Sequence, residues 1–125
     1  MLSAEHTSRF LVPLLRWLDP QISFAAIASV HAVVRKVGHF VEYAVLAALL
    51  WRALHTMLES ARIIAIAEIA IAVSTLFAIS DEFHQSFIAS RTASADDVAV
   101  DICGALFALA VCALLATRRR PAAKL

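Results

Sequence analysis

The sequence has few residues that break helices and few that carry charge. Only two of its 125 residues are Gly and three are Pro, which argues against a turn-rich all-β fold. Charged residues make up 17% of the chain, whereas a soluble domain carries roughly a quarter. Hydrophobic residues make up 62%, and the mean hydropathy is +0.81. These values exclude disorder and leave too little polar surface for a soluble globule. The composition therefore predicts a small all-α membrane protein.

Charge and cysteine content exclude further classes. Eleven Lys and Arg oppose ten Asp and Glu, so we expect no nucleic acid partner. Cys103 and Cys112 are nine residues apart. That separation puts them on opposite faces of a helix, where they cannot form a disulfide bond. The chain has no CxxC or HExxH motif, and we expect neither a metal nor a cofactor.

The first 36 residues read as an outer or interfacial segment. Phe10, Leu14 and Leu18 recur at helical spacing, and Arg16 and Trp17 lie beside them. This pattern fits a short helix that lies in the membrane interface, where Trp is enriched. A short helix packed on its neighbours fits the pattern equally well.

Three apolar stretches follow, at residues 37–57, 61–80 and 98–117. Eighteen helical residues are about 27 Å long, enough to cross the hydrocarbon core of a bilayer. We therefore expect residues 1–125 to form one membrane domain. Its architecture would be a bundle of three transmembrane helices with an N-terminal interfacial helix.

Basic residues near the ends of the spans predict the orientation. Their numbers on the two sides are nearly equal, but Arg118, Arg119 and Arg120 directly follow the last span. Because cytoplasmic flanks are enriched in Lys and Arg, this run favours a cytoplasmic C-terminus. The N-terminus and residues 81–97 would then lie outside.

Polar residues from three separate stretches gather at that outer side. A charged side chain at the centre of a bilayer costs about 2.5–3.5 kcal/mol, so such residues are rare unless they are paired or used. We therefore expect them to face one another and to form a binding site, although some could serve only as interface anchors and ion pairs. The candidate binding residues are Lys36, His39, Glu42, Tyr43, Asp81, Glu82, Gln85, Arg91, Asp97 and Asp101.

One helical face carries a graded stripe. Asp97, Asp101, Gly104 and Ala108 follow one another at i, i+4, i+7 and i+11. The stripe begins with acids and ends with small residues. This order predicts a helix that packs closely against its neighbours and opens toward a polar mouth.

Three motifs in register resemble those of the VanZ-like membrane proteins. RKVGHFVEY at Arg35–Tyr43 is similar to the family's Lys-x-x-His-Phe-x-x-Tyr, and DEFHQSFIASR at Asp81–Arg91 is similar to its Asp-Glu-x-x-Gln followed by Arg. DVAVDICG at Asp97–Gly104 is similar to Asp-x-x-x-Asn-x-x-Gly. The resemblance implies a multi-pass protein of the bacterial cytoplasmic membrane, in a family associated with resistance to teicoplanin-type glycopeptides.

The chain departs from the family pattern in two ways. The family usually has four spans, and we expect the first to be absent here: either the natural start lies upstream or this member works with three. Asp101 stands where the family usually has Asn, which adds a charge.

Three kinds of function follow from these residues. In the first, the cluster binds an envelope lipid or a cell-wall component, with Lys36 and Arg91 on phosphate or carboxylate. The second is an intramembrane enzyme acting on a lipid-linked phosphate. His39 would be the general base, and either Glu42 or Asp97 would be the acid that fixes the tautomer of its imidazole. An enzyme could alternatively hold a divalent cation; the ligands would be His39, Asp81, Glu82 and His84.

Binding is favoured over catalysis, because no Ser or Cys lies in a nucleophile motif and the carboxylates lack metal-ligand spacing. The third function is that of a structural subunit that forms homo-oligomers through the stripe at residues 97–108. Membrane lipids are the expected partners in every case.

Overall fold

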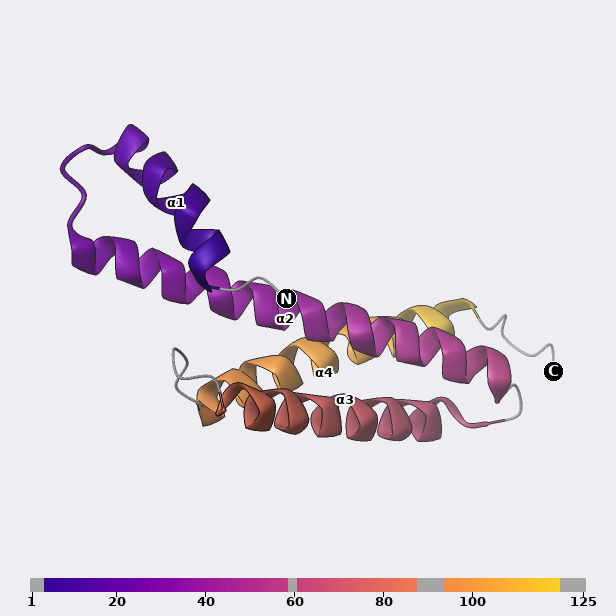
Figure 1. The fold of residues 1–125 in the computed structure, drawn as a ribbon. Helices are drawn as coiled ribbons and strands as arrows, with labels where there is room; N and C mark the ends of the chain where they lie inside the picture. Colours follow the sequence, from indigo (N-terminus) through magenta and orange to yellow (C-terminus); the bar gives the residue numbers. More distant parts are fainter. Residues whose placement is uncertain (1–3, 59–60, 88–93, 120–125) are drawn as a thin grey trace. The chain divides into compact units, whose positions relative to one another are not determined.

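The described part of the chain consists of four helices. The computed structural model describes residues 4–58, 61–87 and 94–119. In chain order the helices are α1 (Ala4–Leu18), α2 (Phe24–Met57), α3 (Ile63–Gln85) and α4 (Ala95–Arg119) (Figure 1). The prediction of an all-α fold is confirmed. Three of the helices, α2, α3 and α4, are long and apolar enough to cross a membrane, so the protein is a multi-pass membrane protein.

The chain divides into two compact units, residues 1–38 and 39–125. The first unit contains α1 and the start of α2. Helix α2 runs from the first unit into the second, which contains all of α3 and α4.

In the first unit a tight turn joins α1 to α2. The backbone N–H of Gln21 donates to Asp19 Oδ1 at 3.0 Å, and the N–H of Ile22 donates to the Asp19 carbonyl at 3.1 Å. Ser23 then caps α2, because its Oγ accepts from the N–H of Ala26 at 3.2 Å. The side-chain oxygens of Asp and Ser thus satisfy backbone donors where the helical hydrogen bonds stop.

Helix α1 is amphipathic, with its apolar side open. Phe10, Leu14, Trp17 and Leu18 follow one helical stripe, and each is more than half exposed. Pro13 lies inside the helix, and Arg16 stacks over the ring of Phe24 at 5.7 Å. Of the two arrangements expected for this segment, an exposed apolar stripe favours the interfacial one.

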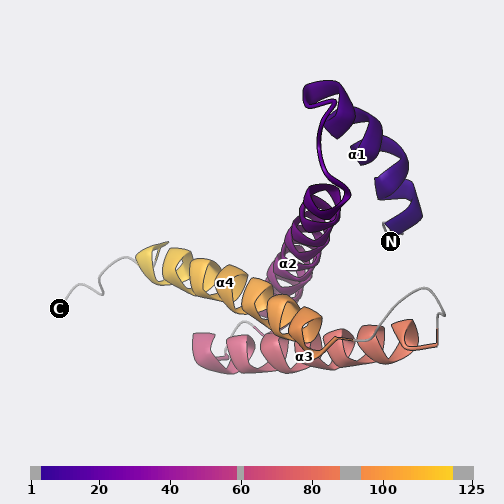
Figure 2. The ribbon, with the colours of Figure 1, turned by 90° about the vertical axis from the view of Figure 1, so that its left-hand side faces the viewer.

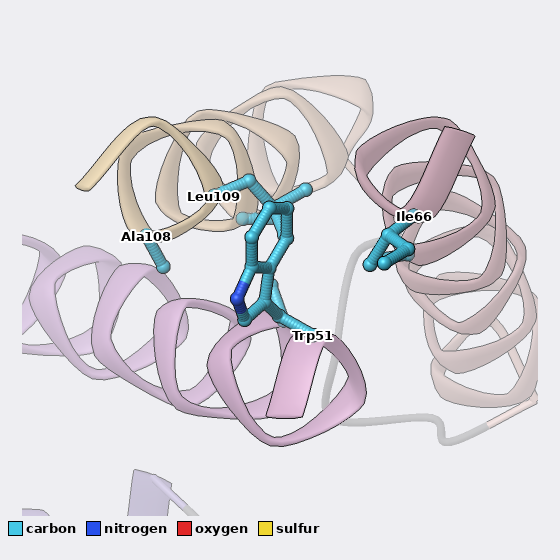
Figure 3. Close-up of a cluster of buried hydrophobic side chains, with 7 residues drawn as sticks. Trp51, Ile66, Ala108 and Leu109 are labelled. Atoms are coloured by element: carbon cyan, nitrogen blue, oxygen red, sulfur yellow. The ribbon is translucent and has the colours of Figure 1, made fainter. Parts of the chain in front are cut away.

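The second unit holds the apolar core. Helices α3 and α4 pack side by side, as Figures 1 and 2 show. The later part of α2 joins them in one buried cluster, formed by Ala47, Trp51, Ile66, Ala70, Ala105, Ala108 and Leu109. In Figure 3 the Trp51 indole of α2 lies against Leu109 of α4, and Ile66 approaches from α3. Four of these seven residues are Ala, and such small side chains let the three helix backbones come close together.

The helices are longer than the spans expected from hydropathy. Helix α2 has 34 residues and begins at Phe24, well before residue 37. Helix α3 has 23 residues and continues to Gln85, so that Asp81, Glu82 and His84 lie on a helix. Because α3 continues this far, Asp81 and Glu82 are held in the fixed geometry of a helix.

Candidate functional site

A buried hydrogen bond between His39 and Asp101 joins α2 to α4. His39 Nδ1 lies 3.1 Å from Asp101 Oδ1, and the two residues are 9% and 2% exposed. Asp101 is among the most completely buried large side chains in the described part of the chain. An acid buried this deeply is stabilised only if a partner compensates its lost hydration, and His39 supplies that compensation.

The close approach of two backbones creates the pair. A Cβ built on Gly104 would lie 2.2 Å from the carbonyl oxygen of Phe40, so only Gly fits at this crossing. Phe40 follows His39, and Gly104 is one turn after Asp101 on the same face of α4. The Gly104 crossing therefore sets the register in which the imidazole meets the carboxylate.

More acids stand close to this pair. Asp101 is near enough to Asp97 and Asp81 to interact with their charges. The phenol of Tyr43 is likewise within electrostatic range of Asp81, Asp101 and Glu82. All three helices of the second unit therefore contribute to one polar cluster.

The start of α4 is tied to the end of α3. The N–H of Ser94 donates a short hydrogen bond to Glu82 Oε1. Asp96 and Asp97 occupy the first turn of α4, and the N–H of Asp97 donates to the Ser94 carbonyl at 3.0 Å. Negative charge in a first turn also stabilises the helix dipole, so Asp97 has a structural role besides any role in binding.

The structure places the candidate residues at several depths. Five of them are buried in the second unit: His39, Tyr43, Gln85, Asp97 and Asp101. Asp81 and Glu82 are partly buried beside them, and Glu42 is exposed. Lys36 is exposed and belongs to the first unit. Arg91 lies outside the described residues.

A family model matches most of the chain. The model described as VanZ/LLP1 covers residues 3–116. The chain belongs to the VanZ/LLP1 family. No curated protein and no solved structure matches it.

The first and third motifs that resembled this family lie on α2 and α4, and the start of the second, up to Gln85, lies on α3. Tyr43 comes from the first motif, Gln85 from the second and Asp101 from the third, and all three side chains are buried. The VanZ/LLP1 assignment from the motifs is confirmed.

One relationship in this VanZ/LLP1 protein was not expected from the sequence. The sequence offered Glu42 or Asp97 as the acid that orients His39, but in the structure His39 is hydrogen-bonded to Asp101. The stripe of Asp97, Asp101 and Gly104 was the available signal, since it places Asp101 on the packed face of its helix. The facing residue on α2 could be found only from the register of the helices.

The expected close packing of the stripe is confirmed. Asp97, Asp101 and Ala108 are buried, and so is Gly104 at its crossing with α2. This face of α4 therefore packs against α2 within the chain.

The described residues of the polar cluster do not form a metal-binding site. Within residues 4–58, 61–87 and 94–119, no group of three or more His, Cys, Asp or Glu is arranged to hold a metal ion. Of the residues considered as ligands, His39 is engaged by Asp101 and His84 is exposed.

An ionised carboxylate accepts hydrogen bonds and donates none. When Asp101 is ionised, the proton of a neutral His39 ring must therefore be on Nδ1, donating to Oδ1. Nε2 is then left as an acceptor. Together with the Tyr43 hydroxyl and the Gln85 amide, the cluster offers groups that hydrogen-bond to hydroxyl, amide and ammonium groups.

Proposed function

We propose that this protein binds the polar headgroup of an envelope lipid or a lipid-linked cell-wall component. It would do so from the outer side of a bacterial cytoplasmic membrane, with its own C-terminus in the cytoplasm. The supporting observation is the buried His39–Asp101 pair, with Tyr43 and Asp97 within electrostatic range of Asp101 and Gln85 also buried in this unit. Burying so many polar groups is costly, and a chain that needed only to fold could use apolar residues there instead.

The chemistry of the cluster suits a headgroup with several hydrogen-bonding groups. The carboxylates accept from hydroxyl, amide and ammonium groups, and the Gln85 amide can both donate and accept. Arg91 is the proposed partner of phosphate or carboxylate, because a guanidinium can bind such groups through two parallel hydrogen bonds. Reduced exposure of a cell-wall component would explain teicoplanin resistance.

The experiment is a binding measurement on the purified protein in detergent. Native mass spectrometry with a lipid-linked cell-wall precursor and with phosphatidylglycerol would report occupancy for each. Tyr43→Phe removes one buried hydroxyl, and Gln85→Leu removes one buried amide. Each should lower precursor occupancy roughly fivefold or more, since a hydrogen bond is worth about 1 kcal/mol and bonds to charged groups more.

The matched control is Glu68→Gln. Glu68 is an exposed acid of α3 outside the cluster, so its replacement should leave occupancy unchanged. Unchanged occupancy in both cluster variants would refute the proposal. Susceptibility of a host to teicoplanin, measured with the same variants, would then test the link to resistance separately.

A second candidate function is catalysis on a lipid-linked phosphate, and one observation favours it. A carboxylate that fixes the tautomer of a histidine is the arrangement by which general bases are oriented, and Asp101 holds His39 in this way. The discriminating measurement is turnover on a lipid diphosphate with a free terminal phosphate: water deprotonated by His39 would attack the terminal phosphorus, and the P–O bond to the lipid monophosphate would break. Inorganic phosphate and the lipid monophosphate should therefore appear in equal amounts. Binding of the lipid without release of phosphate would support the binding function and contradict catalysis.

A further inference from the structure

A recess lies in the second unit, away from the polar cluster. It has a volume of about 480 Å³ and is lined by the end of α2, the start of α3 and the end of α4. Its floor is apolar, since Trp51 is 7% and Ile66 1% exposed. The size is within the range of about 300–1,000 Å³ that is usual for ligand pockets.

The rim of this recess is polar and basic. Arg52, His55 and Thr56 follow Trp51 along the last turns of α2, and all three line the recess near its opening. None of the described residues that line the recess is acidic. The Thr56 hydroxyl donates to backbone carbonyls of its own helix. The guanidinium and the imidazole above an apolar floor can complement a molecule with an anionic head and an apolar tail.

We infer that this recess binds one phospholipid with an anionic phosphate headgroup. The phosphate lies against Arg52 and His55, and part of an acyl chain lies on Trp51 and Ile66. The rest of the lipid stays in the bilayer, because 480 Å³ holds only part of such a molecule. This inference concerns the opposite end of the second unit and does not depend on the proposed function of the polar cluster.

Charge favours a lipid over a second copy of the chain as the occupant. Arg62, which precedes α3, and Arg118, near the end of α4, add to the positive charge at this end of the helices. A second copy presenting the same end would repel the first, whereas an anionic lipid would be attracted.

The test uses Trp51 as its own reporter. The chain has two Trp residues, so Trp17→Phe leaves Trp51 alone on the floor of the recess. The full chain is reconstituted in vesicles that contain increasing fractions of either brominated phosphatidylglycerol or brominated phosphatidylcholine. Bromine quenches a tryptophan that it contacts. Both lipids carry a phosphate, but the choline ammonium makes phosphatidylcholine neutral overall. Half-maximal quenching should therefore need about fivefold less phosphatidylglycerol, because one basic residue beside a net anionic lipid contributes about 1 kcal/mol.

Two variants separate a specific contact from general charge. Arg52→Gln should remove the preference for phosphatidylglycerol, while Arg62→Gln, which removes the same charge outside the recess, should preserve it. Equal quenching by the two lipids in the parent protein would overturn the inference. Equal loss of preference in both variants would also overturn it, since surface charge would then be sufficient.

A third variant tests the recess itself. Ala116→Phe adds a ring to its wall and leaves every basic residue in place, so quenching by phosphatidylglycerol should fall. Unchanged quenching would mean that the lipid lies outside the recess. Absent quenching, with Trp51 emission that varies with the protein-to-lipid ratio, would mean that a second copy covers it. Either result overturns the inference.

Discussion

Gly104 of α4 and Phe40 of α2 meet backbone to backbone. A Cβ at residue 104 would lie 2.2 Å from the Phe40 carbonyl oxygen and 3.0 Å from its carbonyl carbon. Both atoms belong to a helix backbone, which cannot rotate aside as the end of a side chain can. The position of His39 beside Asp101 depends on this contact.

Gly104→Ala should therefore destabilise the protein. Overpacking typically costs about 1–3 kcal/mol, and contact with a backbone atom places this variant toward the upper end. Gly38→Ala is the matched control, because a Cβ added at residue 38 would meet nothing within 4 Å. In a helix interior that control should gain up to about 1 kcal/mol. Unfolding in mixed detergent, followed by circular dichroism, measures both; equal stability of the two variants would contradict the crossing.

His39 and Asp101 should be strongly coupled. His39→Ala leaves a buried carboxylate without its imidazole, and breaking such a pair costs about 3–5 kcal/mol. In the double variant His39→Ala/Asp101→Ala neither polar partner is left unpaired, so it should be more stable than the sum of the two single changes implies. A double-mutant cycle of unfolding free energies measures this coupling. Additive effects would show that the pair contributes nothing.

Trp51 should be the most sensitive apolar position of the described core. It is the large ring among small residues, and Phe or Trp to Ala in a core costs about 3–5 kcal/mol. Trp17→Ala is the control, since Trp17 is 78% exposed. The control should change stability by less than about 1 kcal/mol. Similar losses in the two variants would argue against the packing in Figure 3.

The C-terminus should be cytoplasmic. Green fluorescent protein fused after Leu125 should fluoresce, and alkaline phosphatase at the same place should be inactive, because each works on only one side of the membrane. Replacing the basic run that begins at Arg118 with Gln should weaken this orientation. An active phosphatase fusion to the unchanged chain would place the polar cluster on the cytoplasmic side.

Much of the fold could be predicted because helices are encoded locally. Apolar runs of about 18 residues and the scarcity of Gly and Pro are sufficient to predict long helices. The packed face of α4 was also visible, since Asp101, Gly104 and Ala108 repeat at helical spacing.

The partner of Asp101 could not be predicted in the same way. His39 and Glu42 lie three residues apart and share one side of α2, yet His39 is buried and Glu42 is exposed. Which of them meets α4 depends on the rotation of one helix against another, and the Gly104 crossing fixes that rotation. Periodicity in one segment carries no information about such a register.

The sequence pattern also did not predict where the helices end. The polar run at the end of α3 reads as a loop by hydropathy, but the helix continues to Gln85. Hydropathy reports where a helix could leave the hydrocarbon, whereas the hydrogen bonds of the backbone decide where it stops.

The length of α2 has a consequence for the membranes this protein can occupy. Its 34 residues extend about 51 Å, while a hydrocarbon core is about 30 Å thick. The helix can tilt, or its extra residues can lie among the headgroups. Thinner and thicker bilayers can therefore be matched without exposing the ends of the helix to acyl chains. A member of this family with such a helix should therefore tolerate wide variation in lipid chain length.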